Sequence, residues 1–262
     1  MGRLVGKLIS VATVLLLRHG RTTSNASGTL AGRTPVSLDD TGVAQAVDVG
    51  RRLAGLPLAA VVSSPLPRCL QTLEHALPSA TPAIDAGLIE CGYGDWEGKE
   101  LKQLAKDPLW RVVQQHPSAV RFPGAEGEAM SAMSARAVAT IRAWDERISA
   151  EHGPDALWLA CSHGDVIKSI VADALGMHLD LFQRVVVDPA SVTVIRYTSG
   201  RPFLAKLNDT GGGLGALVVT KKSKRRRAAA TDSDAAVGGG AGAALTGIAL
   251  PGSGSAPSHA AG

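Results

Sequence analysis

Aromatic residues and cysteines are scarce in this chain of 262 residues. Phe, Trp and Tyr make up only 3% of it, which leaves little for the stacking platforms that bind single-stranded nucleic acids. The three cysteines, Cys69, Cys91 and Cys161, form no CxxC pair. Their number and spacing argue against a disulfide framework and a structural zinc site, and they favour a reducing compartment. We expect three small, buried thiols.

The chain also lacks an apolar run of 18 residues, which excludes a transmembrane helix at the level of the sequence. Residues 8–17 follow two basic residues, as the core of a signal peptide would. However, they lead into Arg18-His19-Gly20 rather than a cleavage site of small residues. This exit is typical of a buried strand that feeds a polar loop. A cytoplasmic protein is therefore expected.

Excess charge is confined to the C-terminal segment. The formal net charge is +4, but residues 211–262 hold six of the 27 Lys and Arg and two of the 23 Asp and Glu, so 21 of each sign remain in residues 1–210. This neutral body is predicted not to bind nucleic acid. Gly and Ala account for 25 of the 52 residues in 211–262, which predicts a disordered tail that is dispensable for activity and stability. Its basic run, 221–227, is compatible with weak binding to polyanions.

Short apolar bursts alternate with stretches of helical length, which is typical of a three-layer α/β/α sandwich with a mostly parallel sheet. We expect residues 1–12 to be an N-terminal extension and residues 13–210 to be one domain. Strands are predicted at 13–17, 59–63, 83–85, 157–161, 192–197 and 203–206, and helices at 41–54, 65–76, 128–151 and 165–175. Residues 86–127 mix turns with short helical pieces and are expected to form an insertion or lid.

Two helix starts carry recognisable capping patterns. Ser64 followed by Pro65 predicts an N-cap with proline at the first helical position, and Ser162 with Asp165 has the form of a capping box.

Polar residues follow three of the predicted strands directly. The sequence RHGR stands at 18–21, SSPLPR at 63–68 and SHGD at 162–165, and an irregular segment at 88–98 contains Glu90. Ligands bind at the carboxyl ends of the strands in open parallel sheets. We therefore expect two histidines, two or three arginines and a carboxylate to meet at one edge of the sheet.

This set of side chains suits phosphoryl transfer. Arginine guanidinium groups hold a phosphoryl group with paired hydrogen bonds, and N–H groups at helix starts add to the site. Nearby arginine cations lower the pKa of an imidazole, which keeps a nitrogen lone pair available for attack. A carboxylic acid is then needed to protonate the leaving oxygen and to deprotonate water.

Four motifs together resemble the phosphoglycerate mutase-like branch of the histidine phosphatase superfamily. They are LLLRHGRTTSN, SSPLPRCLQT, LIECGYGDWEG and ACSHG, in the order of the family, and the resemblance covers residues 13 to 208. It implies an enzyme that needs neither a metal nor another cofactor. The roles that it implies are phosphorylated nucleophile for His19, phosphoryl binding for Arg18, Arg68 and His163, a neighbouring position for Asn25, and proton donor for Glu90.

The chain departs from the family pattern at the outer pocket and beside the second histidine. Arg21 stands where many members have glutamate after RHG, and Ala129 replaces a serine. Arg21 is thus a candidate substrate contact, with a solvated loop charge as the alternative. Gly164 occupies the place where the phytase-like branch carries its acid, which favours Glu90. The nearby acids Glu97, Asp95 and Glu128 remain alternatives for the proton donor.

We therefore expect a metal-independent phosphatase that hydrolyses a small phosphate monoester through phosphohistidine at His19. The long insertions of cofactor-dependent phosphoglycerate mutases are not evident, so hydrolysis is favoured over the alternative of a phosphomutase. A non-catalytic sensor of a phosphorylated ligand and a nucleic-acid protein that binds through the tail are further alternatives. The sequence leaves the substrate and a homo-oligomer open.

Overall fold

The computed structural model describes residues 12–212, Ala235 and 237–240 of the chain. The remaining residues include most of the predicted N-terminal extension and the basic run at 221–227. Predictions about those parts lie outside the described residues.

A six-stranded sheet forms the middle layer of the molecule. Its order is β3-β2-β4-β1-β5-β6; the first four strands are parallel to one another, and β5 is antiparallel to both of its neighbours, β1 and β6. The strands are β1 (Thr13–Arg18), β2 (Leu58–Ser63), β3 (Ala83–Ile84), β4 (Leu157–Ser162), β5 (Val192–Arg196) and β6 (Phe203–Asp209). The predicted α/β class with a mostly parallel sheet is confirmed, and β5 and β6 pair as the expected hairpin.

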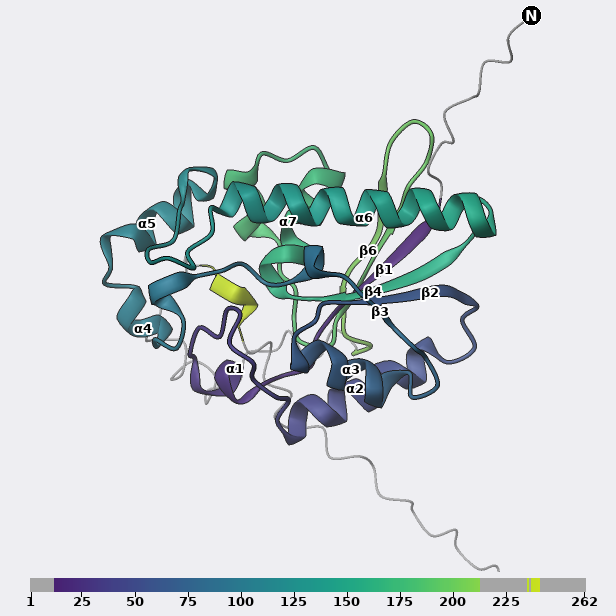
Figure 1. Cartoon of the computed structure of the whole chain (residues 1–262), viewed down its shortest axis with the longest axis horizontal. Coiled ribbons are helices and arrows are strands. Elements are labelled where there is room, and N and C mark those ends of the chain that lie inside the picture. The colour runs from purple at the N-terminus through teal and green to yellow at the C-terminus, as the bar shows by residue number, and fades with distance from the viewer. Residues whose placement is uncertain (1–11, 213–234, 236, 241–262) are drawn as a thin grey trace, which may run out of the picture.

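Helices cover both faces of this sheet (Figure 1). One face carries α2 (Asp40–Leu53) and α3 (Pro67–Ala76), and the other carries α6 (Met130–His152) and α7 (Gly164–Ala174). Shorter helices lie to one side, beyond the strands. They are α1 (Thr23–Ser27), α4 (Leu101–Leu104) and α5 (Pro108–Gln115), and the 3₁₀ turns are η1 (Ala86–Leu88), η2 (Gly94–Trp96), η3 (Pro117–Ala119), η4 (Leu179–Arg184) and η6 (Val237–Gly239).

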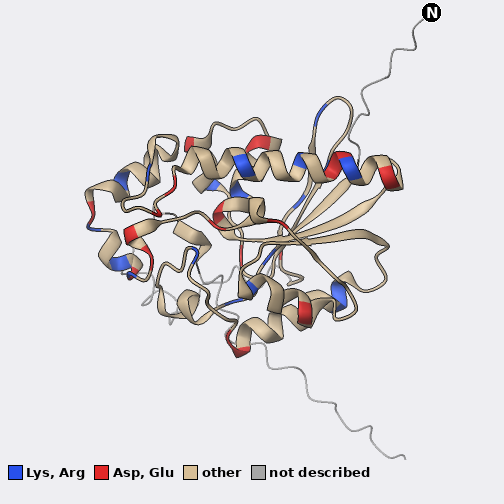
Figure 2. Ribbon diagram, in the orientation of Figure 1, with Lys and Arg blue, Asp and Glu red and all other residues tan. Residues whose placement is uncertain are grey.

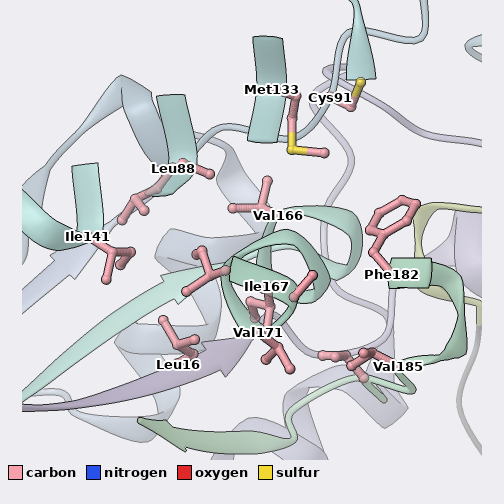
Figure 3. Packing of buried hydrophobic residues seen from close by; sticks show 14 of the residues in the cluster. Leu16, Leu88, Cys91, Met133, Ile141, Val166, Ile167, Val171, Phe182 and Val185 are labelled. Atoms are coloured by element: carbon pink, nitrogen blue, oxygen red, sulfur yellow. The ribbon is translucent and has the colours of Figure 1, made fainter. Parts of the chain in front are cut away.

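The two cores follow from the alternation of side chains along β1. Leu15 and Leu17 belong to the cluster that includes Leu73 of α3. Leu16 points to the opposite face and packs in the cluster that includes Val166 of α7 (Figure 3). Because successive side chains of a strand face opposite sides, a continuous apolar strand supplies both layers. This burial holds the polar end of β1 in a fixed place.

Both predicted helix caps are wrong, because the N-cap residues are Leu66 and His163 rather than the two serines. α3 begins at Pro67 after Leu66, while the hydroxyl of Ser64 lies 2.7 Å from Nε2 of His163. α7 begins at Gly164 after His163, and Ser162 Oγ donates to the carbonyl of Leu88 at 2.8 Å. Both serines thus tie the site and its surrounding loops together.

Aromatic rings pack against one another within the segment 86–127. Trp96 is 1% exposed, and its ring centroid lies 6.2 Å from that of Trp110 and 5.4 Å from that of Phe122. The segment lies beyond the sheet together with α1 (Figure 1). That it acts as a lid stays a prediction.

Charges of both signs are interspersed on the outer helices, as α6 shows (Figure 2). None of the helices in the described part of the chain is both long and apolar enough to cross a membrane.

The expectation of disorder throughout 211–262 is not met at Ala235 and 237–240. Val237 is 2% exposed and belongs to the larger apolar cluster. Composition reflects the apolar area that the whole segment can bury, whereas a short glycine run can dock through backbone hydrogen bonds.

Candidate active site

A cavity of about 530 Å³ lies where the polar motifs that follow β1 and β2 meet the 88–98 segment. Its lining includes His19, Arg68 and Glu90, which are far apart in the sequence. Asn25 and Arg21 line it as well. Five of the predicted site residues therefore border one space, and the other two, Arg18 and His163, are not part of its lining.

The ring of His19 is held by a hydrogen bond on each nitrogen. Nδ1 lies 2.8 Å from the carbonyl oxygen of Gly20, and Nε2 lies 3.2 Å from Nε of Arg68. A carbonyl oxygen only accepts and a guanidinium nitrogen only donates. The proton therefore belongs on Nδ1, and Nε2 carries the lone pair. This is the tautomer that a nucleophilic histidine needs.

Arg68 joins the two histidines at the start of α3. Its Nε also lies 3.2 Å from Nδ1 of His163, whose ring centroid is 5.2 Å from that of His19. The remaining nitrogens of Arg68 donate to the carbonyls of Gly32 and Thr34, at 2.7 and 3.1 Å. This arrangement fixes the cation between both rings.

Burial and the arginines keep both imidazoles neutral. Burial, followed by the charges of Arg68 and Arg18, lowers the pKa of His19 well below its usual 6.5. Burial and the charge of Arg68 likewise lower the pKa of His163. Both rings are therefore uncharged at neutral pH, as predicted from the neighbouring arginines.

Arg18, the last residue of β1, is fully buried beside these rings. Its Nη1 donates to the carbonyl of Val187 at 2.7 Å. Burial lowers the pKa of Arg18 to about 10, because the cation has little water around it. A buried guanidinium of this kind favours an anion as its partner.

Glu90 is 3% exposed, and its Oε1 accepts the N–H of Cys91 at 2.9 Å. Burial, with the negative charge of Asp165, raises the pKa of Glu90 to about 7, against the opposing effects of Cys91, Arg68 and Arg18. A carboxyl group with this pKa can both donate and accept a proton near neutral pH.

The three rival acids do not line this cavity. Glu97 Oε1 accepts the backbone N–H groups of Arg33 and Tyr93, at 3.0 and 3.1 Å, which organises the loop. Burial would raise the pKa of Glu128, but the hydrogen bond and charge of Arg136 and the charge of Arg33 outweigh it and lower the pKa. Glu128 is therefore ionised at neutral pH and is a poor proton donor.

Two arginines that the sequence analysis did not identify clamp the backbone of Glu90. Nη2 of Arg136 and Nε of Arg33 donate to its carbonyl oxygen, at 3.0 and 3.1 Å. Both arginines also pair with the carboxylate of Glu128, at 2.8 Å for Nε of Arg136 and 2.9 Å for Nη2 of Arg33. Arg136 further binds the carbonyl of Ile89 at 2.7 Å. The clamp makes Arg136 a positioning residue for Glu90.

Arg136→Lys is expected to lower kcat roughly 10- to 100-fold, since misplacing a catalytic group by about 1 Å can cost that much. Lysine keeps the charge but not the fork that holds the Glu128 carboxylate and three carbonyls, those of Gly87, Ile89 and Glu90. The measurement is steady-state hydrolysis of a phosphate ester. Arg142→Lys on the same helix, where Arg142 pairs with Asp173 at the surface, is the matched control. Equal kcat values for the two variants would remove the positioning role.

The last two predicted contacts lie at the cavity but already have partners. Oδ1 of Asn25 accepts from the N–H and the hydroxyl of Thr22, at 3.0 and 2.9 Å, and so caps α1. Nε of Arg21 pairs with Asp39 at 2.8 Å. This pairing offsets the positive charge of Arg21 at the edge of the cavity.

A buried carboxylate, Asp165, also lies behind the site. It accepts the hydroxyl of Tyr93 at 2.7 Å and pairs with Lys168 at 3.3 Å. The sequence pattern assigned Asp165 to a helix cap. For that reason the sequence analysis did not identify it as a residue beside the site. Among the described residues, no three His, Cys, Asp or Glu side chains gather as ligands of a metal ion would.

Known proteins share this fold and sequence pattern. A model of the histidine phosphatase superfamily (branch 1) matches residues 14–210. An acid phosphatase of Mycobacterium tuberculosis is 31% identical over 202 residues, which are 76% of this chain and 93% of that protein. A probable phosphoglycerate mutase of Erwinia tasmaniensis is 29% identical over 196 residues, 73% of this chain and 87% of that one.

Solved structures agree on the fold. The phosphoserine phosphatase of Entamoeba histolytica, in complex with 3-phosphoglyceric acid, superimposes with a TM-score of 0.67. The match covers 76% of this chain and 97% of the other, at 22% sequence identity. That structure contains a small phosphorylated ligand.

Proposed function

Since this chain belongs to branch 1 of the histidine phosphatase superfamily, we propose that it hydrolyses a small phosphate monoester through a phosphohistidine at His19. The observation that carries the proposal is the bonding of the His19 ring. The Gly20 carbonyl holds the proton on Nδ1, so the lone pair is on Nε2, where it accepts from Arg68, and the cavity that His19 lines is also lined by Glu90. The nucleophile and the acid thus face the same space.

In the first step, Nε2 of His19 attacks phosphorus and the bond between phosphorus and the ester oxygen breaks. The carboxyl group of Glu90 gives its proton to the departing oxygen, which leaves as an alcohol. In the second step, the Glu90 carboxylate takes a proton from water as the water oxygen attacks phosphorus. The bond between phosphorus and Nε2 breaks, phosphate is released and Glu90 is again protonated.

Arg18, Arg68 and His163 hold the phosphoryl group in this proposal. The arginines supply positive charge in a site without much water, where it stabilises the transferring oxygens more strongly than in solution. His163 carries its proton on Nε2, because Nδ1 accepts from Arg68. Movement of that N–H from Ser64 to a phosphoryl oxygen would add a neutral donor.

A phosphomutase is the second candidate, because one relative is named as a probable phosphoglycerate mutase. The two activities share the phosphohistidine and differ in the acceptor, which is water in one case and a second hydroxyl group in the other. The three free, buried cysteines fit a cytoplasmic location, which we propose as well.

The proposal is tested by offering a panel of phosphorylated metabolites and measuring free phosphate. We expect release of phosphate from at least one ester, with no change when a chelator is added. Phosphoryl groups recovered on a second metabolite instead of in solution would favour the mutase. Tight binding of an ester with no turnover would contradict both enzymes and support a sensor.

A further inference from the structure

Ala235 and Val237–Gly240 return to the active site from beyond the catalytic domain. Figure 1 shows η6, in yellow, inside the outline of the folded body. Val237, Gly238 and Gly240 form part of the cavity lining, together with His19 and Glu90. We call Ala235 and Val237–Gly240 the C-terminal segment.

Backbone carbonyls of the C-terminal segment accept hydrogen bonds from the guanidinium group of Arg18. Nη2 donates to the carbonyls of Gly238 and Gly240, at 3.3 and 2.8 Å, and Nη1 donates to that of Gly239. The N–H of Gly238 donates to Oδ2 of Asp165 at 3.1 Å. The segment therefore satisfies both a cation and an anion of the site.

The other end of the segment is held by α5. The side chain of Gln114 exchanges two hydrogen bonds with the backbone of Ala235, at 2.9 and 3.0 Å. Val237, between the two attachments, is 2% exposed. Polar and apolar contacts thus fix the segment at several points along its length.

Only glycine fits where the segment meets Arg18. The φ angles of Gly238, Gly239 and Gly240 are +71°, +77° and +43°, which L residues with side chains rarely adopt. A Cβ on Gly239 would lie 3.0 Å from Cζ of Arg18 and 3.0 Å from Cα of Gly164. The body thus leaves space beside Arg18 and Gly164 that fits glycine and no larger residue.

Carbonyl oxygens and a phosphoryl group cannot share these donors. Each terminal nitrogen of a guanidinium has two N–H groups, and both nitrogens of Arg18 already have two acceptors. All these acceptors are uncharged, whereas phosphoryl oxygens carry the negative charge that suits a buried cation. Binding of phosphate through these two terminal nitrogens of Arg18 requires the segment to leave.

We propose that the catalytic domain carries a binding site for its own C-terminal segment, and that the docked segment competes with the phosphoryl group for Arg18. This rests on the proposed function only in assigning Arg18 to the phosphoryl group. Docking lowers the fraction of molecules that can bind substrate, and the apparent affinity falls by the same factor. The expectation of a dispensable tail is thereby replaced by one of a self-inhibiting tail.

Gly239→Val in the full chain tests this docking. We expect a cooperatively folded protein that binds inorganic phosphate more tightly in calorimetry, about tenfold if the segment is docked nine-tenths of the time. KM for 4-nitrophenyl phosphate is expected to fall by a similar factor. Gly200→Val is the matched control, because a Cβ at Gly200 meets no atom within 4 Å and no change in affinity is expected.

A second variant, Gln114→Ala, loosens the attachment at α5 without touching the glycine run, and we expect a smaller shift in the same direction. Unchanged phosphate affinity in both variants would overturn the docking proposal, and weaker affinity would overturn it in favour of a segment that completes the phosphate site. If phosphate binds more tightly to Gly239→Val but no variant hydrolyses any ester, docking stands and the proposed function fails.

Discussion

His19→Ala is expected to abolish phosphate release, with turnover lower by about 10⁴-fold or more, the scale on which loss of a nucleophile acts. Alanine removes the only protein atom that bonds to phosphorus in the proposed mechanism. The fold should persist, because His19 follows β1 and the apolar residues of the strand remain. The measurement is phosphate release from an ester that the natural chain hydrolyses.

The matched control is His75→Ala, which removes an exposed histidine in the last turn of α3. It is expected to keep full activity. Incubation of the natural chain with a labelled ester should leave an acid-labile, base-stable label that His19→Ala does not acquire. Undiminished turnover in His19→Ala would remove the phosphohistidine from the mechanism.

The placement of the principal site residues could be predicted because it follows from strand geometry. Parallel neighbours β1, β2 and β4 end at the same edge, so the residues that follow them meet there. Nε of Arg68 lies 3.2 Å from a nitrogen of each histidine, although the histidines are far apart in the sequence. Glu90 follows no parallel strand directly, and the motif resemblance was needed to choose it.

The clamp around Glu90 could not be predicted from local patterns. Arg33, Arg136 and Glu128 meet because α6 and two loops pack together, and an arginine on an amphipathic helix resembles an ordinary solvated charge. The predicted helix caps were wrong for a related reason. Ser64 and Ser162 have side chains that suit an N-cap, but tertiary partners bind their hydroxyl groups.

The C-terminal segment shows where composition is a poor guide. Mean composition predicts whether a stretch can build its own core, and Gly and Ala cannot. Docking into a prepared crevice has different requirements. Glycine admits close approach to Arg18, and its backbone supplies both donors and acceptors. A run of three glycines after a valine was a local signal for this within a segment that is otherwise rich in glycine.

Glu90 must serve as an acid and then as a base, so its pKa decides the pH range of the reaction. Burial and the charge of Asp165 raise that pKa to about 7, and a bound phosphate dianion would raise it further. Below about pH 7 the carboxyl group is protonated and can donate. The pKa of His19 lies well below 6.5, so its Nε2 remains available there. The value of kcat/KM, which reports the pKa of the free enzyme, should therefore be highest on the acidic side of neutrality and fall as the pH rises through 7.

Glu90→Gln is expected to lower turnover by about 10² to 10⁴-fold for esters with poor leaving groups, while phosphate affinity is retained. Glutamine fills the same space but has no proton to donate to an alkoxide. An aryl phosphate departs with little protonation, so its phosphorylation of His19 should suffer less and the phosphoenzyme should accumulate. Rapid-quench measurement of labelled enzyme separates the two steps.

Glu126→Gln, at an exposed acid of the neighbouring loop, is the matched control and should behave as the natural chain. The comparison between the leaving groups is decisive, because a structural role for Glu90 would slow both ester types alike. Equal losses in the phosphorylation step, or no loss for either ester, would exclude Glu90 as the proton donor. The proton would then come from Asp165, which is buried beside the site, or from Glu97, Asp95 or Glu128 after movement of the 86–127 segment.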